Sequence, residues 1–444
     1  EEKPSVHGEF GNTNNWTRYK EAIIEWVEGN QSEIRTVVSS LVSSGLNNRT
    51  EEFVNWVTDT TSPQGLIAKS QSIIDNEEIA TNDISEKLAE GGILPMFGMP
   101  TTVKNLYHGI KRDLEEKSID RPQSMAIYEF APGAQKTKDK AIHTVIGFTS
   151  DFVTRRQGQN EIVTNTPVNN NLPFSLNRWF VRCRSCGYFE TYSDETKTQM
   201  EAQNLFVACP NCGEQDESRY HPPIKLKAPR AYRTNLSLGS DLREDSEIIL
   251  SRPPIFAEKI DDPNNPDSNK TVNNASLTIS DKDVTWRVNT NSDNYFTGRL
   301  ANTTNAFPFA HSFRFTNQWI AQNVIDINQL NPFNENGYSY RIYPEGELEQ
   351  IALASSKKTE IFRIRPASIA LDLDLNMFSR ESDPPSVKAQ ANGVRSGFYS
   401  AAFLLQRILA DKLDVDPTEI EIADISLARL PDGTRTAEIV LTDE

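Results

Sequence analysis

All four cysteines of the chain lie in one short segment, as two Cys-x2-Cys pairs. Cys183 and Cys186 form the first pair, and Cys209 and Cys212 form the second after a spacer of 22 residues. Two such pairs at this separation are the layout of a tetrahedral metal site with four thiolate ligands, above all a structural zinc site. The segment 181–215 is therefore predicted to be a zinc ribbon that binds one structural Zn²⁺ ion.

Two disulfides, or a redox-active dithiol, are the alternatives to a metal. Neighbouring Cys-x2-Cys pairs make poor disulfide staples, and a redox dithiol needs only one such pair, so the metal is favoured. Gly187 and Gly213 directly follow the two pairs, where a tight turn often needs a positive φ angle. Four thiolates leave no open position for water or substrate, so the site is predicted to be structural. Reduced thiolates in turn predict a cytoplasmic protein.

Other patterns of catalytic residues are weak or missing. The sequence contains no phosphate-binding Gly-x4-Gly-Lys-Ser/Thr motif, and its five histidines have no metal-ligand spacing. His143 lies in an apolar stretch and is predicted to be a core residue. Asp372 and Asp374 could share one face of a strand and hold Mg²⁺, but no third carboxylate or lysine accompanies them at nuclease spacing. We therefore predict that the chain is not an enzyme, with a metal-dependent nuclease as the weakest alternative.

Clusters of basic residues beside aromatic ones are candidates for nucleic-acid contacts. The net charge of −16 excludes a protein whose whole surface is basic, so any contact with DNA must be local. The candidates are Arg155, Arg156, Arg178, Arg182, Arg184, Lys225, Lys227, Arg230 and Arg233. Such clusters can bind phosphates and stack bases. Strand-borne arginines on a structural or partner-facing surface would produce the same pattern, and this second interpretation is favoured.

The pattern along the 444 residues predicts an α+β, multidomain protein. Residues 1–90 are predicted to form a helical domain or connector, 91–257 a β-rich domain that contains the zinc ribbon, 258–274 a loop or linker, and 275–444 a mixed α/β domain.

Periodicity places individual elements within these regions. Helices are predicted over 16–29, 32–46, 63–92 and 400–413, and strands over 124–133, 141–148, 178–183, 187–193, 205–209, 276–288, 339–345, 359–375 and 436–441. The helix over 400–413 carries Leu404, Leu405, Ile408, Leu409 and Leu413 on one predicted apolar stripe. Asp416 is predicted to cap a further turn, with Pro417 behind it and Glu419 three residues after the cap.

Several stretches resemble a known group of proteins. "GGILPMFGMPTTVKNLY" (91–107) resembles the segment that follows the second motor lobe in a group of bacterial superfamily-2 helicases. The stretches 7–30, 127–148 and 396–422, together with the four cysteines, continue the likeness in the same order. The chain is thus similar to the domain of unknown function that trails such helicases. It is most similar to the DrmB-type accessory subunits of the DISARM anti-phage defence system.

This resemblance implies a function. It implies a non-catalytic, zinc-binding, cytoplasmic subunit of an anti-phage complex that partners a helicase-like DrmA-type subunit and helps to bind or guide DNA. ATPase activity is then expected in the partner, and neither a membrane nor a small-molecule substrate is expected. The alternative is that the chain is the C-terminal half of a superfamily-2 DNA helicase whose motor lobes lie upstream.

Overall fold

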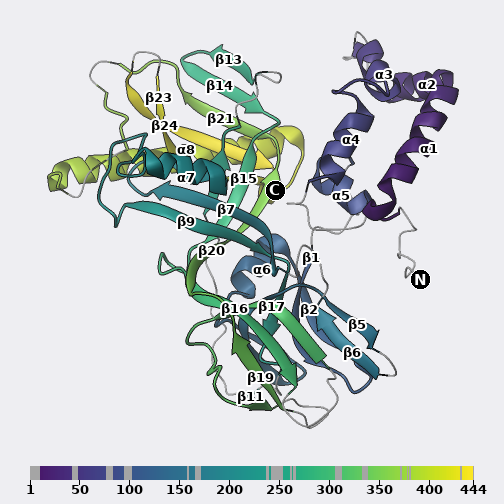
Figure 1. Ribbon diagram of the computed structural model, residues 1–444. Helices are drawn as coiled ribbons and strands as arrows, with labels where there is room; N and C mark the ends of the chain where they lie inside the picture. The colour runs from purple at the N-terminus through teal and green to yellow at the C-terminus, as the bar shows by residue number, and fades with distance from the viewer. Residues whose placement is uncertain are drawn as a thin grey trace. The chain divides into compact units, whose positions relative to one another are not determined.

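The chain folds into two compact units, Glu1–Val103 and Lys104–Glu444. A computed structural model describes residues 11–42, 49–76, 84–94, 103–157, 160–165, 172–236, 240–241, 254–260, 263, 267–305, 313–332, 339–370, 373–377, 379, 382–430 and 433–443. Helices fill the first unit, and strands dominate the second, which ends in an α/β arrangement (Figure 1). The predicted α+β class with a helical N-terminal part is confirmed.

The first unit is built from short helices around a small core. They are η1 (Thr13–Asn15), α1 (Trp16–Gly29), α2 (Gln31–Leu41), α3 (Thr50–Thr58), α4 (Leu66–Ile74) and α5 (Ile84–Glu90). Trp16, Ile74 and Ile84 are buried together, and the Trp16 indole Nε1 donates a hydrogen bond of 2.9 Å to Gln71 Oε1. α1 ends at Gly29, as predicted. The next helix, predicted over 32–46, is α2, and residues 43–46 lie outside the described residues.

The second unit contains a continuous hydrogen-bonded network of 18 strands. They are β1 (Val103–Ile110), β2 (Glu116–Pro122), β3 (Gln135–Lys138), β4 (Ala141–Thr149), β5 (Phe152–Gln157), β6 (Asn160–Asn165), β7 (Phe174–Cys183), β8 (Phe189–Tyr192), β9 (Tyr220–Pro229), β10 (Ala231–Thr234), β11 (Ser240–Asp241), β12 (Ile255–Glu258), β15 (Val284–Asn289), β16 (Phe296–Asn305), β17 (Phe313–Ala321), β18 (Asn331–Pro332), β19 (Ser339–Pro344) and β20 (Glu349–Lys358). Its core is aromatic: the rings of Phe148 and Trp319 stack 5.1 Å apart, and the Tyr232 ring meets Phe148 edge-on.

A smaller sheet follows at the C-terminal end. It contains β13 (Ser268–Val272), β14 (Ala275–Ser280), β21 (Ile361–Pro366), β22 (Ile420–Ile422), β23 (Ser426–Arg429) and β24 (Arg435–Asp443). The long helix α8 (Pro385–Leu413) packs on this sheet through Ala402, Leu405 and Leu409. The turn η4 (Pro417–Glu419) carries the predicted capping box of Asp416 and Glu419.

Part of the segment 258–274, predicted as a loop or linker, forms a strand. Residues 268–272 form β13, which pairs with β14 in an antiparallel hairpin. Strands on either side of the segment also pair with each other, because β12 pairs with β15 and β9 pairs with β20. The large sheet therefore continues on both sides of the segment 258–274, and β13 within the segment belongs to the smaller sheet.

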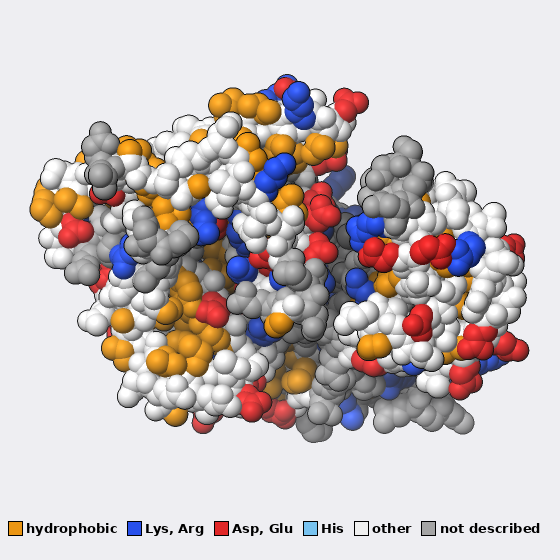
Figure 2. Space-filling view, turned by 90° about the horizontal axis from the view of Figure 1, so that it is seen from above, with side chains coloured by type: hydrophobic (Ala, Val, Ile, Leu, Met, Phe, Trp, Pro, Cys, Tyr) orange, Lys and Arg blue, Asp and Glu red, His pale blue; other side chains and the backbone are white. Residues whose placement is uncertain are grey.

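Several predicted elements differ from the structure. Residues 124–129, predicted as part of a strand over 124–133, lie in helix α6 (Gln123–Glu129). One face of this helix packs Ala126 and Ile127 into the core. Residues 205–208 are turns rather than a strand, and Leu205 and Val207 are exposed there. The predicted apolar stripe of α8 splits: Leu405 and Leu409 face the sheet, whereas Leu404, Ile408 and Leu413 are exposed. Hydrophobic side chains are also visible on the surface in Figure 2.

Candidate metal centre

The four cysteines converge on one buried point. β7 ends at Cys183, and the other three residues lie in the two turns that the Cys-x2-Cys pairs form. Cys183 Sγ lies 3.6 Å from Cys212 Sγ, and Cys186 Sγ lies 3.6 Å from Cys209 Sγ. All four sulfurs lie within 4.8 Å of one another. A disulfide bond is about 2.05 Å long, so these cysteines are free thiols.

The geometry suits a single metal ion. Zinc binds thiolate at about 2.3 Å, and a tetrahedron of that radius has edges of about 3.8 Å between sulfurs. The two measured separations of 3.6 Å are close to that edge. The cluster can therefore hold one metal ion with four sulfur ligands.

The two turns share one backbone arrangement. Gly187 N donates to Cys183 O at 2.9 Å, and Gly213 N donates to Cys209 O at 2.8 Å. Both glycines have a positive φ, +70° and +78° respectively, so the left-handed conformation expected from the sequence is present. The 22-residue spacer contains β8, which pairs with β7, and the helix α7 (Asp194–Ala202).

The cluster is attached to the C-terminal sheet. Leu427 N donates to Cys186 O at 2.9 Å, and Asn211 Nδ2 donates to Leu427 O at 2.9 Å. Gly187 lies so close to the same segment that an added Cβ would meet Ile425 O at 2.5 Å. These contacts join the metal site to β23, far along the chain. The sequence carries no signal for these contacts, because a single asparagine in a Cys-x2-Cys turn does not specify its hydrogen-bond partner.

Five of the predicted DNA-binding side chains lie on β7 and β9 or directly after β7, and all five have partners within the fold. Arg178 Nε donates to Thr191, Arg182 lies 3.9 Å from Asp424, Arg184 pairs with Asp293, Lys225 lies 2.6 Å from Glu349, and Lys227 donates to Asn177. The carboxylates offset the charge of three of these cations. On the face drawn in Figure 2, the described Lys and Arg side chains are interspersed with Asp and Glu rather than gathered into a stripe.

The aromatic residue in this cluster is also engaged. The ammonium of Lys197 on α7 lies 4.2 Å from the centre of the Trp179 ring, and that of Lys225 lies 5.8 Å from it. The indole Nε1 of Trp179 donates to Asp194 at 2.5 Å. The Trp179 ring therefore helps to hold α7 on the sheet, through a cation–π contact with Lys197 and a hydrogen bond to Asp194.

Arg230 and Arg233 do not belong to a surface patch, which corrects the sequence-based prediction. Arg230 is only 9% exposed and Arg233 is fully buried. Arg233 Nη1 donates to Gln318 Oε1 at 2.5 Å and to Thr303 Oγ1 at 3.1 Å, so its charge is solvated by side chains inside the sheet. Burial lowers the pKa of its guanidinium. A strand-borne arginine has the same sequence pattern whether it faces the core or the solvent.

Arg155 and Arg156 are exposed, as is Arg184, whose guanidinium pairs with Asp293. Arg155 and Arg156 lie on β5, which pairs with β6 in a hairpin. Arg156 Nε lies 3.6 Å from Glu161 Oε1 across that hairpin, with 84% of its side chain exposed. These two residues remain accessible to a phosphate backbone.

Asp374, one member of the candidate magnesium pair, does not lie on a strand. β21 ends at Pro366, and the described residues 373–377 have no strand conformation. Asp374 accepts hydrogen bonds from Asn376 N and Gln390 Nε2, as a turn residue does. Asp372 lies outside the described residues.

His143 is a core residue, as predicted, and it lies beside a second buried histidine. Its ring centre lies 4.6 Å from that of His108, and both side chains are buried. Burial first, and then the His143 ring, lower the pKa of His108 to about 4. Asp139 opposes this shift, whereas Lys117 and Lys138 add to it. Burial also lowers the pKa of His143. The two rings are therefore neutral partners at pH 7.

This pair predicts a loss of stability in mild acid. The folded-state pKa of His108 lies below the unfolded value of about 6.5, so the unfolded chain takes up the proton first. Its contribution is complete above about pH 6.5 and declines as the pH falls towards 4, by at most about 1.4 kcal/mol per pH unit. The free energy of unfolding in urea should fall less between pH 7.5 and 5.0 in His108→Gln than in the wild type. Equal losses would contradict the prediction.

Comparison of the chain with models of protein families, with curated proteins and with solved structures gave no match. The class that the structure supports is therefore defined by its own features, an α+β protein with a buried cluster of four cysteines that could hold one metal ion. The resemblance to helicase-associated DrmB-type subunits stays a prediction. Within the described parts of the chain, no helix has both the length and the apolar character needed to cross a membrane.

Proposed function

We propose that the protein is a non-catalytic, zinc-bearing subunit of an anti-phage defence complex that acts in the cytoplasm beside a DNA helicase. The proposal identifies the chain as a DrmB-type subunit and its partner as a DrmA-type helicase, which would supply ATP hydrolysis. The observation that carries it is the closed, buried cluster of four cysteines within a chain whose motifs resemble helicase-associated domains in the same order.

The ligand set supports zinc as the metal. Four thiolates at tetrahedral spacing are typical of structural zinc, whereas Mg²⁺ and Ca²⁺ prefer oxygen ligands. When bound, the ion would hold the two turns together and supply folding free energy. Cys183, Cys186, Cys209 and Cys212 would hold it, and their burial keeps substrates away from it.

The attachment of the metal centre supports a scaffolding role. One side of the cluster continues into β7 of the large sheet, and the other contacts β23 of the C-terminal sheet. A metal in this position would fix two parts of the unit relative to each other. A fixed surface of this kind suits a subunit that docks onto a motor and extends its DNA path.

Copurification tests the proposed partnership. A tagged DrmA-type helicase co-expressed with this chain is expected to retain it through affinity and size-exclusion chromatography. ATP hydrolysis should appear only in fractions that contain the helicase. Steady ATP turnover by the purified chain alone would overturn the non-catalytic assignment.

Salt-dependent DNA binding tests the proposed contact surface. Binding of a labelled DNA to the complex should weaken as salt rises, because each neutralised phosphate releases a counterion. In Arg155→Gln/Arg156→Gln, the magnitude of the slope of log Kobs against log[salt] should fall by about two for duplex DNA. The control is Arg341→Gln, which removes an exposed arginine from β19. An unchanged slope in the double variant would exclude this hairpin as a DNA contact.

A further inference from the structure

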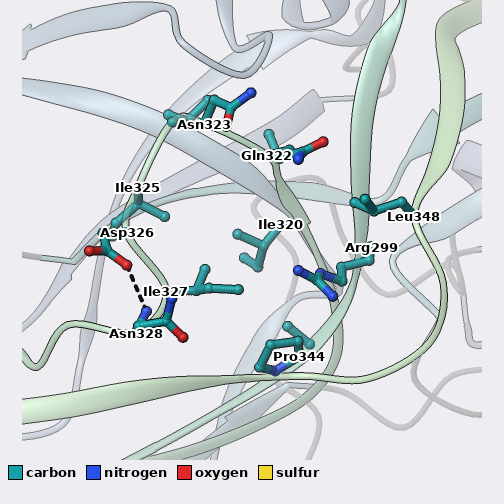
Figure 3. A pocket seen from close by; sticks show the side chains of 13 residues that line it. Arg299, Ile320, Gln322, Asn323, Ile325, Asp326, Ile327, Asn328, Pro344 and Leu348 are labelled. Carbon is teal, nitrogen blue, oxygen red and sulfur yellow. Dashed lines mark hydrogen bonds between the residues drawn. The ribbon is translucent and has the colours of Figure 1, made fainter.

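A hollow of about 490 Å³ lies against β16 and β17, under the chain that follows β17. Figure 3 shows Ile320 and Ile327 inside it, with Pro344 and Leu348 along one side. Side-chain amides of Gln322 and Asn323 lie along its upper side in this view. Mostly apolar walls, a few polar groups and a volume of about 300–1,000 Å³ are the usual features of small-ligand sites.

The hollow contains one cation. Arg299 extends from β16 towards the apolar side chains, and its guanidinium points into the space (Figure 3). Asp326 also lines the hollow, but on the far side in this view, and its carboxylate accepts a hydrogen bond of 2.9 Å from Asn328 N. Among the described residues, no carboxylate lies within ion-pair distance of Arg299.

Two other arginines of this unit form ion pairs. Half-buried Arg287 has Glu421 at 2.5 Å, and buried Arg363 has Asp283. A second hollow, of about 300 Å³, also contains Arg363 together with Lys259 and Asp267, but there Lys259 pairs with Asp267 and Arg363 pairs with Asp283. Arg299 therefore differs from its neighbours, because its donors are directed at an open, apolar space. A charge in such a place is costly unless an anion accompanies it.

We propose that this hollow binds a small amphiphilic anion, with the anionic head on Arg299 and the apolar body against Ile320, Ile327 and Leu348. The fork of a guanidinium binds carboxylate and phosphate oxygens in pairs. The shared chemistry is thus an oxyanion on a short alkyl or aryl chain, which the sequence did not predict. The site is independent of the metal centre and of the proposed DNA contact.

Three probes of equal chain length test both the charge and its kind. Octanoate, octyl phosphate and octanol are titrated calorimetrically into the full chain below their critical micelle concentrations. The two anions are expected to bind at least ten-fold more tightly than octanol, because charge-assisted hydrogen bonds are stronger than those of a neutral hydroxyl. Tighter binding of octanoate assigns the natural ligand to carboxylic acids, and tighter binding of octyl phosphate assigns it to phosphate esters.

Variants separate the specific site from unspecific adsorption. Arg299→Met keeps the length of the side chain and should remove the preference for anions over octanol. Leu348→Glu, at a half-exposed position, places a negative charge at the rim and should weaken anion binding at least ten-fold without altering the core. Arg341→Met, on β19, is the control that should leave binding unchanged. Failure of both anions to bind the wild type, or equal anion binding by the wild type and Leu348→Glu, would overturn the proposal.

Discussion

Cys186→Ser should lose its bound metal and melt at a much lower temperature than the wild type. The segment between β7 and β9 has too few buried apolar residues to fold without further support. Chains below about 40 residues usually need a disulfide, a metal or oligomerisation to be stable. Zinc binding in small peptides is worth about 10–16 kcal/mol, which is comparable to the stability of an entire domain. Loss of one ligand should therefore unfold the ribbon.

The damage should reach the C-terminal sheet, because Cys186 O accepts a hydrogen bond from Leu427 N. Elemental analysis should find about one zinc per wild-type chain and almost none in Cys186→Ser. Limited proteolysis should then cut near β23 as well as in the ribbon. Cys209→His is the matched control: it keeps a zinc ligand in place and should retain most of the metal. A full complement of zinc in Cys186→Ser would contradict the assignment of the site.

Asp283→Ala should lower the free energy of unfolding by about 3–5 kcal/mol, because it leaves a buried cation without its partner. Asp283 precedes β15 and is fully buried, and Arg363 on β21 is 8% exposed. The two side chains form an ion pair, and Ile260 N also donates to Asp283 Oδ1 at 2.9 Å. Glu438, 3.8 Å from Arg363, is too far to replace the lost carboxylate fully.

Two further variants show whether the effect comes from the unpaired charge. Asp283→Ala/Arg363→Met removes both charges and should recover much of the lost stability. Asp411→Ala on α8 breaks an ion pair with Arg407 whose side chains are 67% and 65% exposed, and should change stability by less than about 0.5 kcal/mol. Urea unfolding of the three variants and the wild type gives the comparison. A double variant as unstable as Asp283→Ala would rule out this explanation.

The metal centre was predictable because its information is local. Cys-x2-Cys-Gly fixes the turn, the ligand pair and the positive φ within five residues, and the structure brings both turns to one point. The DNA-binding set was harder to predict, because burial depends on distant partners. Arg233 donates a hydrogen bond to Gln318 across the sheet, and the sequence near either residue does not predict this contact.

The secondary-structure predictions show the same contrast between features set by local sequence and features set by distant contacts. The strand β4 and the capping box at Asp416 have short-range signals and are present as predicted. The apolar run at 124–130 fits a strand or a buried helix equally well, and packing against β20 selects the helix α6. α8 begins at Pro385, well before its predicted start at 400. The sequence pattern gave no sign of this first part, because Gly393 and Gly397 disfavour a helix in isolation.

The pairing of β9 with β20 has a consequence for synthesis on the ribosome. Leu226 lies opposite Ala352, so β9 leaves the exit tunnel long before its neighbour has been translated. Until then one edge of the nascent sheet stays open to other chains, a state that promotes aggregation. Expression of this protein should accordingly depend on chaperones that cover the unpaired edge of β9. Shortened versions that stop before residue 349 lack β20 and would leave that edge of β9 permanently exposed.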